Sequence, residues 1–175
     1  MVWTGAGSTW SPPGFRLCCG GNFLMTNASN AFKIKMRPAE ARDAAAIARL
    51  AEELGYPSTA AQVRVRLAAV KEDPRHVTFV AASMGDEVIG WIHLYENHSP
   101  GSDARAEIAN LVVDSRFRGV GAGRLLVQRG EQWARERGLA VIGLHSNIIR
   151  ERAHAFYLRL GYTVTKSQKV FRKTL

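Results

Sequence analysis

Cysteine is almost absent from this sequence. The 175 residues include only two, and these two, Cys18 and Cys19, are adjacent. Adjacent cysteines provide neither the framework of a disulfide-rich secreted domain nor the ligand spacing of a zinc site. We therefore predict no bound metal and a reducing, cytoplasmic environment. Long apolar runs are also missing, since no window reaches the roughly 18 uninterrupted apolar residues of a membrane-spanning helix. A membrane partner is not expected.

The basic residues form no cluster along the chain, although they are numerous. Lysine and arginine total 24 against 15 acidic residues, so the formal net charge is +9. Such an excess is typical of a protein with an anionic partner, such as a phosphorylated cofactor, an acidic substrate or a nucleic acid, and it also arises from a simple bias toward arginine. No run of about 5 to 8 basic residues forms a nucleic-acid patch, so nucleic acid is not the expected partner.

Residues 1–30 lack the periodicity of the remaining sequence. They contain several glycines, the pair Pro12 and Pro13, and a single charge, Arg16. A signal peptide would require a basic start and a longer apolar run. We interpret residues 1–30 as a flexible tail and residues 31–175 as one folded domain, and the hydrophobic content of 46% is sufficient for a core. An alternative hypothesis places the native start at Met25, and N-terminal sequencing of the native protein tests it.

Hydrophobic periodicity and capping residues predict the secondary structure from residue 31 onward. Residues 32–36 alternate as in a strand, and the apolar spacing from Ile47 to Leu54 predicts a helix that ends at Gly55. Thr59 begins a second helix with a capping box. The remaining elements are predicted as strands at about 76–82, 87–95 and 105–113, a loop at 96–103, a helix at 121–137, a strand at 140–145, a helix at 150–160, and strand-like segments at 162–164 and 170–171. This order predicts an α/β (α+β) fold with helices on both faces of the sheet.

A glycine-rich turn separates the strand at 105–113 from the helix that follows it. The turn reads Arg-Gly-Val-Gly-Ala-Gly at 118–123. Glycines allow the backbone to approach a ligand closely, and the free N–H groups at a helix start bind anions. A Walker A loop would require Gly-Lys-Ser/Thr, and a dinucleotide fingerprint would require glycine at Arg124. Neither fits, so the turn predicts a different phosphorylated ligand, and Arg116, Arg118 and Arg124 are expected to surround it.

Two motifs resemble the GCN5-related N-acetyltransferase (GNAT) family. Arg-x-x-Gly-x-Gly at 118–123, after Ile-Ala-Asn-Leu-Val-Val-Asp at 108–114, is similar to the acetyl-CoA-binding signature of that family. Asn147 and the segment 153–162 resemble its downstream motif. The resemblance covers about residues 32–175. It implies a mixed central sheet, splayed between the fourth and fifth strands, and acetyl-CoA as co-substrate.

The resemblance also implies which residues contact acetyl-CoA. Main-chain groups of the strand would meet the pantetheine arm, amides of the turn would hold the pyrophosphate, and two downstream residues would complete the site. The implied cofactor-binding residues are Leu111, Val112, Val113, Arg118, Gly119, Val120, Gly121, Ala122, Gly123, Arg124, Asn147 and Phe156.

Acetylation of an amine requires a route for the amine proton and an acid for the leaving thiolate. Glu107 is our candidate base, because the family often uses a glutamate on this strand, commonly through a water. Alternation along the strand predicts that it shares a face with Ala109 and Leu111, and a bulge would reverse that face. The alternative is a strand-edge glutamate that faces solvent, with His93 or His145 as the base. Tyr157 is the candidate acid by resemblance, although it also belongs to an i, i+3, i+4, i+7 stripe typical of a helix that packs on the core.

The predicted activity is therefore acetyl-CoA-dependent N-acetylation of a primary amine, by direct attack on the thioester. The segments around Ser146 and Phe171 look similar to aminoalkylphosphonate N-acetyltransferases, which favours a small-molecule acceptor; aminoglycosides and a peptide or protein N-terminus remain alternatives. A catalytically silent CoA-binding regulatory module and a nucleic-acid-binding or protein-binding domain are the non-enzymatic alternatives. Strand-like C-terminal segments also allow a homodimer.

Overall fold

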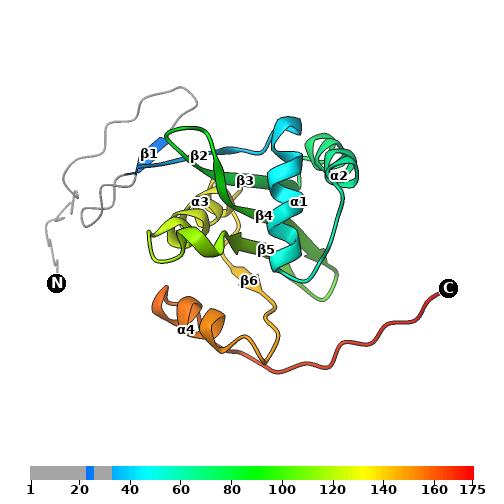
Figure 1. The fold of residues 1–175 in the computed structure, drawn as a ribbon. Coiled ribbons are helices and arrows are strands. Elements are labelled where there is room, and N and C mark those ends of the chain that lie inside the picture. The colour runs from blue at the N-terminus through cyan, green and yellow to red at the C-terminus, as the bar shows by residue number, and fades with distance from the viewer. Residues whose placement is uncertain (1–22, 26–32) are drawn as a thin grey trace, which may run out of the picture.

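The computed structural model describes residues 23–25 and 33–175, and Figure 1 shows their arrangement. The strands are β1 (Phe23–Met25), β2 (Ile34–Pro38), β3 (His76–Ser83), β4 (Val88–Ser99), β5 (Ser102–Val113) and β6 (Ile142–Leu144). The helices are α1 (Ala44–Glu53), α2 (Ala60–Glu72), α3 (Ala122–Glu136) and α4 (Glu151–Arg159), with short 3-10 helices at Ala41–Asp43 and Ser115–Phe117.

The strands form one mixed sheet in chain order. β1 to β5 pair antiparallel with their neighbours, and β6 pairs parallel to β5. A parallel pair needs a crossover connection, which α3 supplies. β6 pairs with Ala106–Ile108 alone, whereas β5 continues to Val113, so the two strands separate beyond this short ladder. The predicted α+β fold and the splay between these two strands are confirmed.

Helices cover both faces of the sheet (Figure 1). α1 and α2 pack one face through a cluster that includes Val80, Trp91 and Val112. α3 packs the opposite face, where Leu126 and Leu94 belong to the larger cluster. The central strands β3, β4 and β5 therefore contribute residues to two separate cores, as expected for a sheet buried on both sides.

The helix boundaries follow from local chemistry. The Thr59 hydroxyl accepts a hydrogen bond from the Gln62 backbone N–H at 3.2 Å, and the Gln62 side chain accepts from the Thr59 N–H at 2.9 Å. This capping box begins α2 as predicted. α1 and α4 are each followed by a glycine with positive φ, Gly55 at 84° and Gly161 at 89°, where other residues would be strained.

Two sequence-based expectations are wrong. The predicted loop at 96–103 is mostly strand, because the antiparallel ladder of β4 and β5 extends to the pair Ser99 and Ser102, and backbone pairing does not require apolar side chains. The predicted strands at 162–164 and 170–171 are not formed. Val164 is 76% exposed and Phe171 is 89% exposed, so this segment packs against no sheet edge within the described residues.

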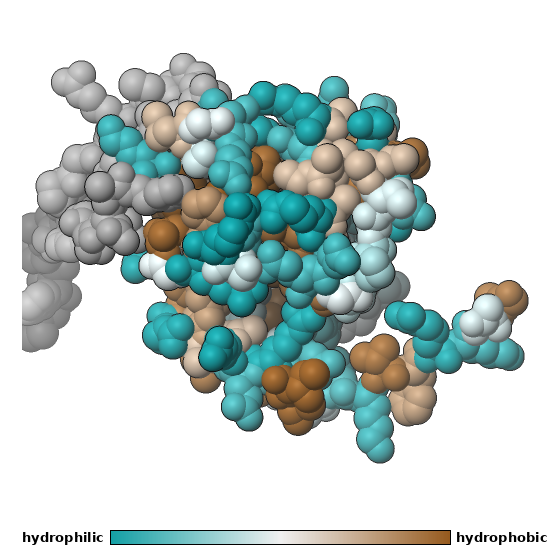
Figure 2. All heavy atoms as spheres, in the orientation of Figure 1, coloured by the Kyte–Doolittle hydropathy of each residue, from teal (hydrophilic) through white to brown (hydrophobic). Residues whose placement is uncertain are grey.

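Hydrophobic side chains are exposed before α4 and in the C-terminal segment, where the predicted strands are not formed. Figure 2 shows hydrophilic side chains over the centre of the face in view, hydrophobic residues beside the connection to α4, and both kinds along the C-terminal segment. Ile148 and Ile149, between β6 and α4, are about 80% exposed. β1 lies inside the range predicted as a tail, and the rest of that range, including Cys18, Cys19 and Arg16, falls outside the described residues.

Candidate active site

The glycine turn has the backbone geometry that an anion site requires. Gly119 and Gly121 have φ angles of 86° and 91°, and Gly121 is the N-cap of α3. The first helical hydrogen bond runs from the Leu125 N–H to the Gly121 carbonyl at 3.1 Å. The N–H groups of Ala122, Gly123 and Arg124 therefore have no acceptor within the helix. Together with the positive end of the helix dipole they form a site for negative charge. Val120 packs inward against the larger core cluster and anchors the turn.

The arginines around this turn behave differently from the expectation. Arg116 does not line the turn: its guanidinium binds Asp114 at 2.8 Å and Glu87 at 3.0 Å. Arg118 reaches back to Glu53 at the end of α1, at 3.1 Å. Arg124 is exposed in the first turn of α3. The local excess of positive charge is thus smaller than the sequence indicates.

Asp114 joins β5 to the turn. The sequence indicated only that it ends a strand, and its structural role was not predicted. It is 1% exposed and accepts hydrogen bonds from the backbone and guanidinium of Arg116 and from Arg49 at 2.8 Å. The Arg116 hydrogen bond holds the pKa of the Asp114 carboxyl well below its usual range, against the opposing effect of burial. A buried acid with two bound arginines fixes the direction in which the chain enters the turn. The sequence signal for this role is an aspartate that directly follows a buried strand and precedes an arginine by two residues.

The end of β5 presents a strand edge beside the turn. Leu111, Val112 and Val113 pair with β4, and no strand of the described residues pairs with them on the β6 side. Val112 is buried toward α1, whereas Leu111 and Val113 pack toward α3. The side chains are therefore occupied in the core, and main-chain groups are what this edge offers to a ligand. An extended ligand with amides could pair there like an additional strand.

α4 lies against the turn through its aromatic residues. A Cβ atom at Gly123 would lie 3.4 Å from the Phe156 ring, so glycine at this position allows α4 to approach α3 closely. Tyr157 contacts Phe156 and Tyr162 in edge-to-face geometry, with ring centroids 5.1 Å and 5.5 Å apart. Burial raises the pKa of Tyr157 to about 12, so the phenol stays protonated at neutral pH. The Tyr157 ring also packs on the larger core cluster, as the alternative interpretation of this helix predicts.

Asn147 lies in the connection between β6 and α4. Its side-chain oxygen accepts a hydrogen bond from the Ile149 N–H at 3.2 Å, and its backbone carbonyl accepts one from the Arg150 N–H at 2.9 Å. These bonds form a compact turn ahead of α4. Asn147 is exposed, and it follows the end of β6 at the side where the splay opens.

Glu107 takes the opposite sheet face from the one that simple alternation predicts. The β4–β5 ladder shifts register so that His93 faces Asn110 and Leu94 faces Ile108, which leaves Ala109 as a bulge. An additional residue reverses the alternation beyond it. Glu107 therefore shares a face with Asn110 and Val112 rather than with Ala109 and Leu111, and this expectation is corrected.

The Glu107 carboxylate is buried between β4 and β6. The residue is 3% exposed. Its Oε1 accepts hydrogen bonds from Arg105 Nε at 2.8 Å and from Asn97 Nδ2 at 3.5 Å. Its Oε2 lies 3.9 Å from Nδ1 of His145. The alternative of a glutamate that faces solvent does not describe this site, because the side chain is enclosed.

His93 lies on the same face as Glu107, two residue pairs closer to the splay along the β4–β5 ladder. Its Nδ1 is 2.9 Å from the Thr78 hydroxyl, and its Nε2 is 3.4 Å from Nδ1 of His76. Burial lowers the pKa of His93 to about 4, with a smaller contribution from His76. The ring is therefore neutral at pH 7, and both of its nitrogens have protein partners.

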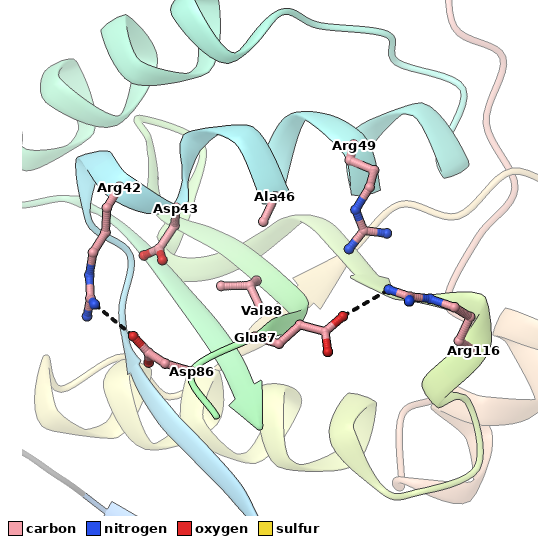
Figure 3. A pocket seen from close by; sticks show the side chains of 8 residues that line it. All are labelled: Arg42, Asp43, Ala46, Arg49, Asp86, Glu87, Val88 and Arg116. Atoms are coloured by element: carbon pink, nitrogen blue, oxygen red, sulfur yellow. Dashed lines mark hydrogen bonds and ion pairs between the residues drawn. The ribbon is translucent and has the colours of Figure 1, made fainter. Parts of the chain in front are cut away.

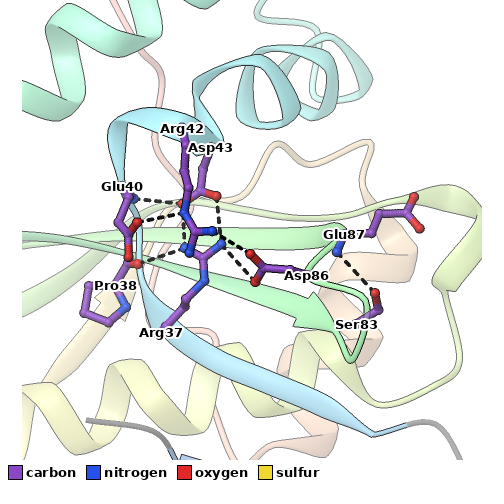
Figure 4. A network of polar contacts seen from close by, with 8 residues as sticks. All are labelled: Arg37, Pro38, Glu40, Arg42, Asp43, Ser83, Asp86 and Glu87. Atoms are coloured by element: carbon purple, nitrogen blue, oxygen red, sulfur yellow. Dashed lines mark hydrogen bonds and ion pairs between the residues drawn. The ribbon is translucent and has the colours of Figure 1, made fainter.

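A separate pocket of about 400 Å³ opens between α1, the β3–β4 hairpin and Arg116 (Figure 3). Its lining consists of Arg42, Asp43, Ala46, Arg49, Asp86, Glu87, Val88 and Arg116, and it includes none of the predicted catalytic or cofactor-binding residues apart from Arg116, which was expected near the phosphate. The polar network at one end of it is shown in Figure 4, where buried Arg37 binds Asp43 in a bidentate pair at 2.7 and 2.8 Å. Its arginines and acids are paired with one another, which is the arrangement of a structural network.

The described residues show two further absences. None of their helices has the length and apolarity of a membrane span. No group of three or more His, Cys, Asp or Glu side chains within this part of the chain is arranged to hold a metal ion.

A mixed sheet that splays beside a glycine turn at a helix start defines the class of acetyltransferase domains. The Acetyltransferase (GNAT) family model matches residues 43–162, and the chain belongs to this family. The chain is 37% identical to aminoalkylphosphonate N-acetyltransferase of Salmonella typhimurium over 114 residues. The matched segment covers 65% of this chain and 71% of that protein.

Solved structures agree on the fold. An aminoglycoside N-acetyltransferase, AAC(6')-Iy, in complex with CoA superimposes with a TM-score of 0.73 at 14% identity, over 85% of this chain and all of that one (100%). A transcriptional regulator from Bacillus halodurans gives a TM-score of 0.71 at 23% identity, over 80% of this chain and 99% of that one. At such identities the likeness concerns the fold alone. The predicted family resemblance is confirmed.

Proposed function

We propose that the protein is an acetyl-CoA-dependent N-acetyltransferase that acetylates a primary amine of a small molecule. One observation carries the proposal: the left-handed Gly121 exposes the amides at the start of α3 directly beside the unpaired edge of β5. A ligand that joins a pyrophosphate to an amide-containing arm fits both features together. A silent regulatory module would keep this geometry and bind the cofactor without turnover.

The acceptor amine must lose a proton before or during attack. An amine with a pKa of about 10.4 is neutral in only about one molecule in a few thousand at pH 7. The amine nitrogen would form a bond to the thioester carbonyl carbon, and the carbon–sulfur bond would break. Glu107 supplies the carboxylate that receives the amine proton through an intervening group, in the simplest case a water. Tyr157, protonated at neutral pH, would return a proton to the thiolate.

An amine that carries an anionic group is the favoured acceptor class. The net charge of +9 supports a negatively charged substrate, and the relative at 37% identity is named for aminoalkylphosphonates. Acidic pockets suited to a polycation have less support, since Glu107 is already paired with Arg105. A peptide N-terminus is the second acceptor to test.

The test is release of free thiol from acetyl-CoA with a panel of amines that includes an aminoalkylphosphonate, an aminoglycoside and a peptide. We expect turnover with the aminoalkylphosphonate. Tyr157→Phe should lower kcat about 10²–10⁴-fold, as for loss of a general acid, with little change in acetyl-CoA binding. Tyr162→Phe is the matched control, because this ring belongs to the same aromatic cluster and its hydroxyl binds Glu131 at 3.3 Å. Binding of acetyl-CoA without turnover on any amine would instead identify a regulatory module.

A further inference from the structure

The two oxygens of Glu107 have different surroundings. Oε1 is engaged by Arg105 and Asn97. Oε2 faces β6, where a Cβ atom at Gly143 would lie 3.4 Å away from it. The absence of a side chain at Gly143 leaves room for this oxygen, and Nδ1 of His145 lies 3.9 Å from it.

His145 connects this buried carboxylate to the outside. It directly follows the last residue of β6, at the side where β5 and β6 separate, and its side chain is 72% exposed. The Glu107 side chain is 5% exposed, so an acceptor in the splay has far readier access to the imidazole than to the carboxylate. Nδ1 lies beyond hydrogen-bond length from Oε2, so the pairing requires the exposed ring to move toward the carboxylate, which Arg105 holds in place.

The other histidine on this face lacks these features. Both ring nitrogens of His93 are engaged by Thr78 and His76. Its ring is also stacked near His76, with centroids 5.5 Å apart. It has no carboxylate partner among the contacts of the described residues and no comparable exposure.

We propose that His145 takes the proton from the acceptor amine and that Glu107 is the positioning residue that orients the imidazole and stabilises its cation. The inference rests on the proposed function and differs from it in one step: the proton stays on the His145 imidazole instead of passing through a water to Glu107. The lone pair of the amine nitrogen forms the carbon–nitrogen bond, and the departing proton goes to Nε2 of His145. Nδ1–H donates to Glu107 Oε2. The carbon–sulfur electrons leave with the thiolate, which Tyr157 protonates. A base oriented by a carboxylate is a recurrent solution for activating a nucleophile.

The charged and titratable groups that face the pair are known from the contacts. They are Arg105 on β5, which binds Glu107, and Tyr95 on β4, which lies opposite Glu107, whereas Asn97 on β4 carries no charge. If His145 is the base, its protonation state should govern the acidic limb of the pH–rate profile, since a protonated imidazole cannot accept the amine proton.

The test compares His145→Gln, Glu107→Gln and the double variant in the thiol-release assay. His145→Gln should lower kcat about 10²–10⁴-fold, change the acidic limb of the pH–rate profile, and leave the acetyl-CoA-induced thermal shift intact. Because the two residues act as one unit, the double variant should be no slower than the slower single variant. His98→Gln is the matched control, as His98 is an exposed histidine at the far end of β4, bound to Glu96.

Two results would overturn the inference. One is a His145→Gln enzyme with wild-type kcat and pH profile while Glu107→Gln is impaired, which would assign the step to Glu107 and a water. The other is a double variant whose loss equals the product of the single losses. A wild-type protein that releases no thiol with any amine of the panel would reject the proposed function, and this inference with it.

Discussion

Replacing Gly90 by alanine should disturb the strand edge that we assign to the cofactor. Gly90 lies on β4 opposite Val113. A Cβ atom there would lie 2.8 Å from the Val112 carbonyl oxygen, 3.3 Å from Val113 Cα and 3.2 Å from a Leu126 methyl. Two of these three neighbours are backbone atoms of β5, so the clash cannot be relieved by rotating a side chain. The end of β5 must shift by several tenths of an ångström.

The expected loss of stability follows from opposing contributions. Overpacking a core costs about 1–3 kcal/mol, and the upper half applies here because backbone must move. Burial of the new methyl and the lower entropy of the unfolded chain together return about 1 kcal/mol. The net loss is about 1–2 kcal/mol. For a protein of this length that corresponds to a decrease in Tm of about 2–8 °C.

The assay is thermal unfolding with and without acetyl-CoA. Gly90→Ala should lower Tm and also reduce the acetyl-CoA-induced increase, because moving Val112 and Val113 displaces the strand end whose opposite edge we assign to the cofactor. Gly85→Ala is the control: its Cβ would meet only the Ser83 hydroxyl at 3.8 Å, in the β3–β4 hairpin outside the β4–β5 ladder. A Gly90→Ala protein that matches Gly85→Ala in both measurements would refute the close approach of β4 and β5 and the role of this edge.

Two further predictions concern the chain between β5 and α3. Gly121→Val should abolish the acetyl-CoA-induced thermal shift by straining a φ of 91° and blocking the amides, whereas Gly138→Val, with a φ of 71° after α3, should lose similar stability and keep the shift. An unchanged shift in the first variant would remove the turn from the site. Asp114→Asn should cost about 1–3 kcal/mol at pH 7 in urea denaturation. Because the pKa of Asp114 is lowered in the folded state, its contribution is present above the unfolded value of about 3.9 and disappears as the pH falls further. The difference from wild type should therefore shrink at low pH, and a constant difference would contradict this account.

Local chemistry made the helices and the turn predictable. Thr59 and Gln62 satisfy each other's backbone groups within four residues of sequence, so the start of α2 depends on no distant contact. Gly121 is likewise predictable, because a left-handed residue between a strand and a helix demands glycine. In each case the residues that decide the structure are neighbours in the chain.

Positions that depend on partners far away in the sequence were not predictable. The strand predicted at 162–164 is not formed, because a strand needs a sheet edge that pairs with its backbone groups. No strand of the described residues pairs with this segment. The charge around the turn was overestimated for a similar reason. Arg116 is adjacent to the turn in sequence, but Asp114 and Glu87 bind it on the other side of the sheet.

The position of Glu107 depends on one residue that the sequence does not reveal as special. Ala109 is an ordinary strand residue, and nothing in its neighbours indicates that the ladder with β4 omits it. Without this bulge, Glu107 would share a face with Leu111, which packs toward α3, and its carboxylate would be among apolar core residues. With the bulge, it shares the face of Asn110 and can approach His145. A bulge next to a functional strand thus re-aims the side chain that precedes it, and the chemistry we propose depends on that change of face.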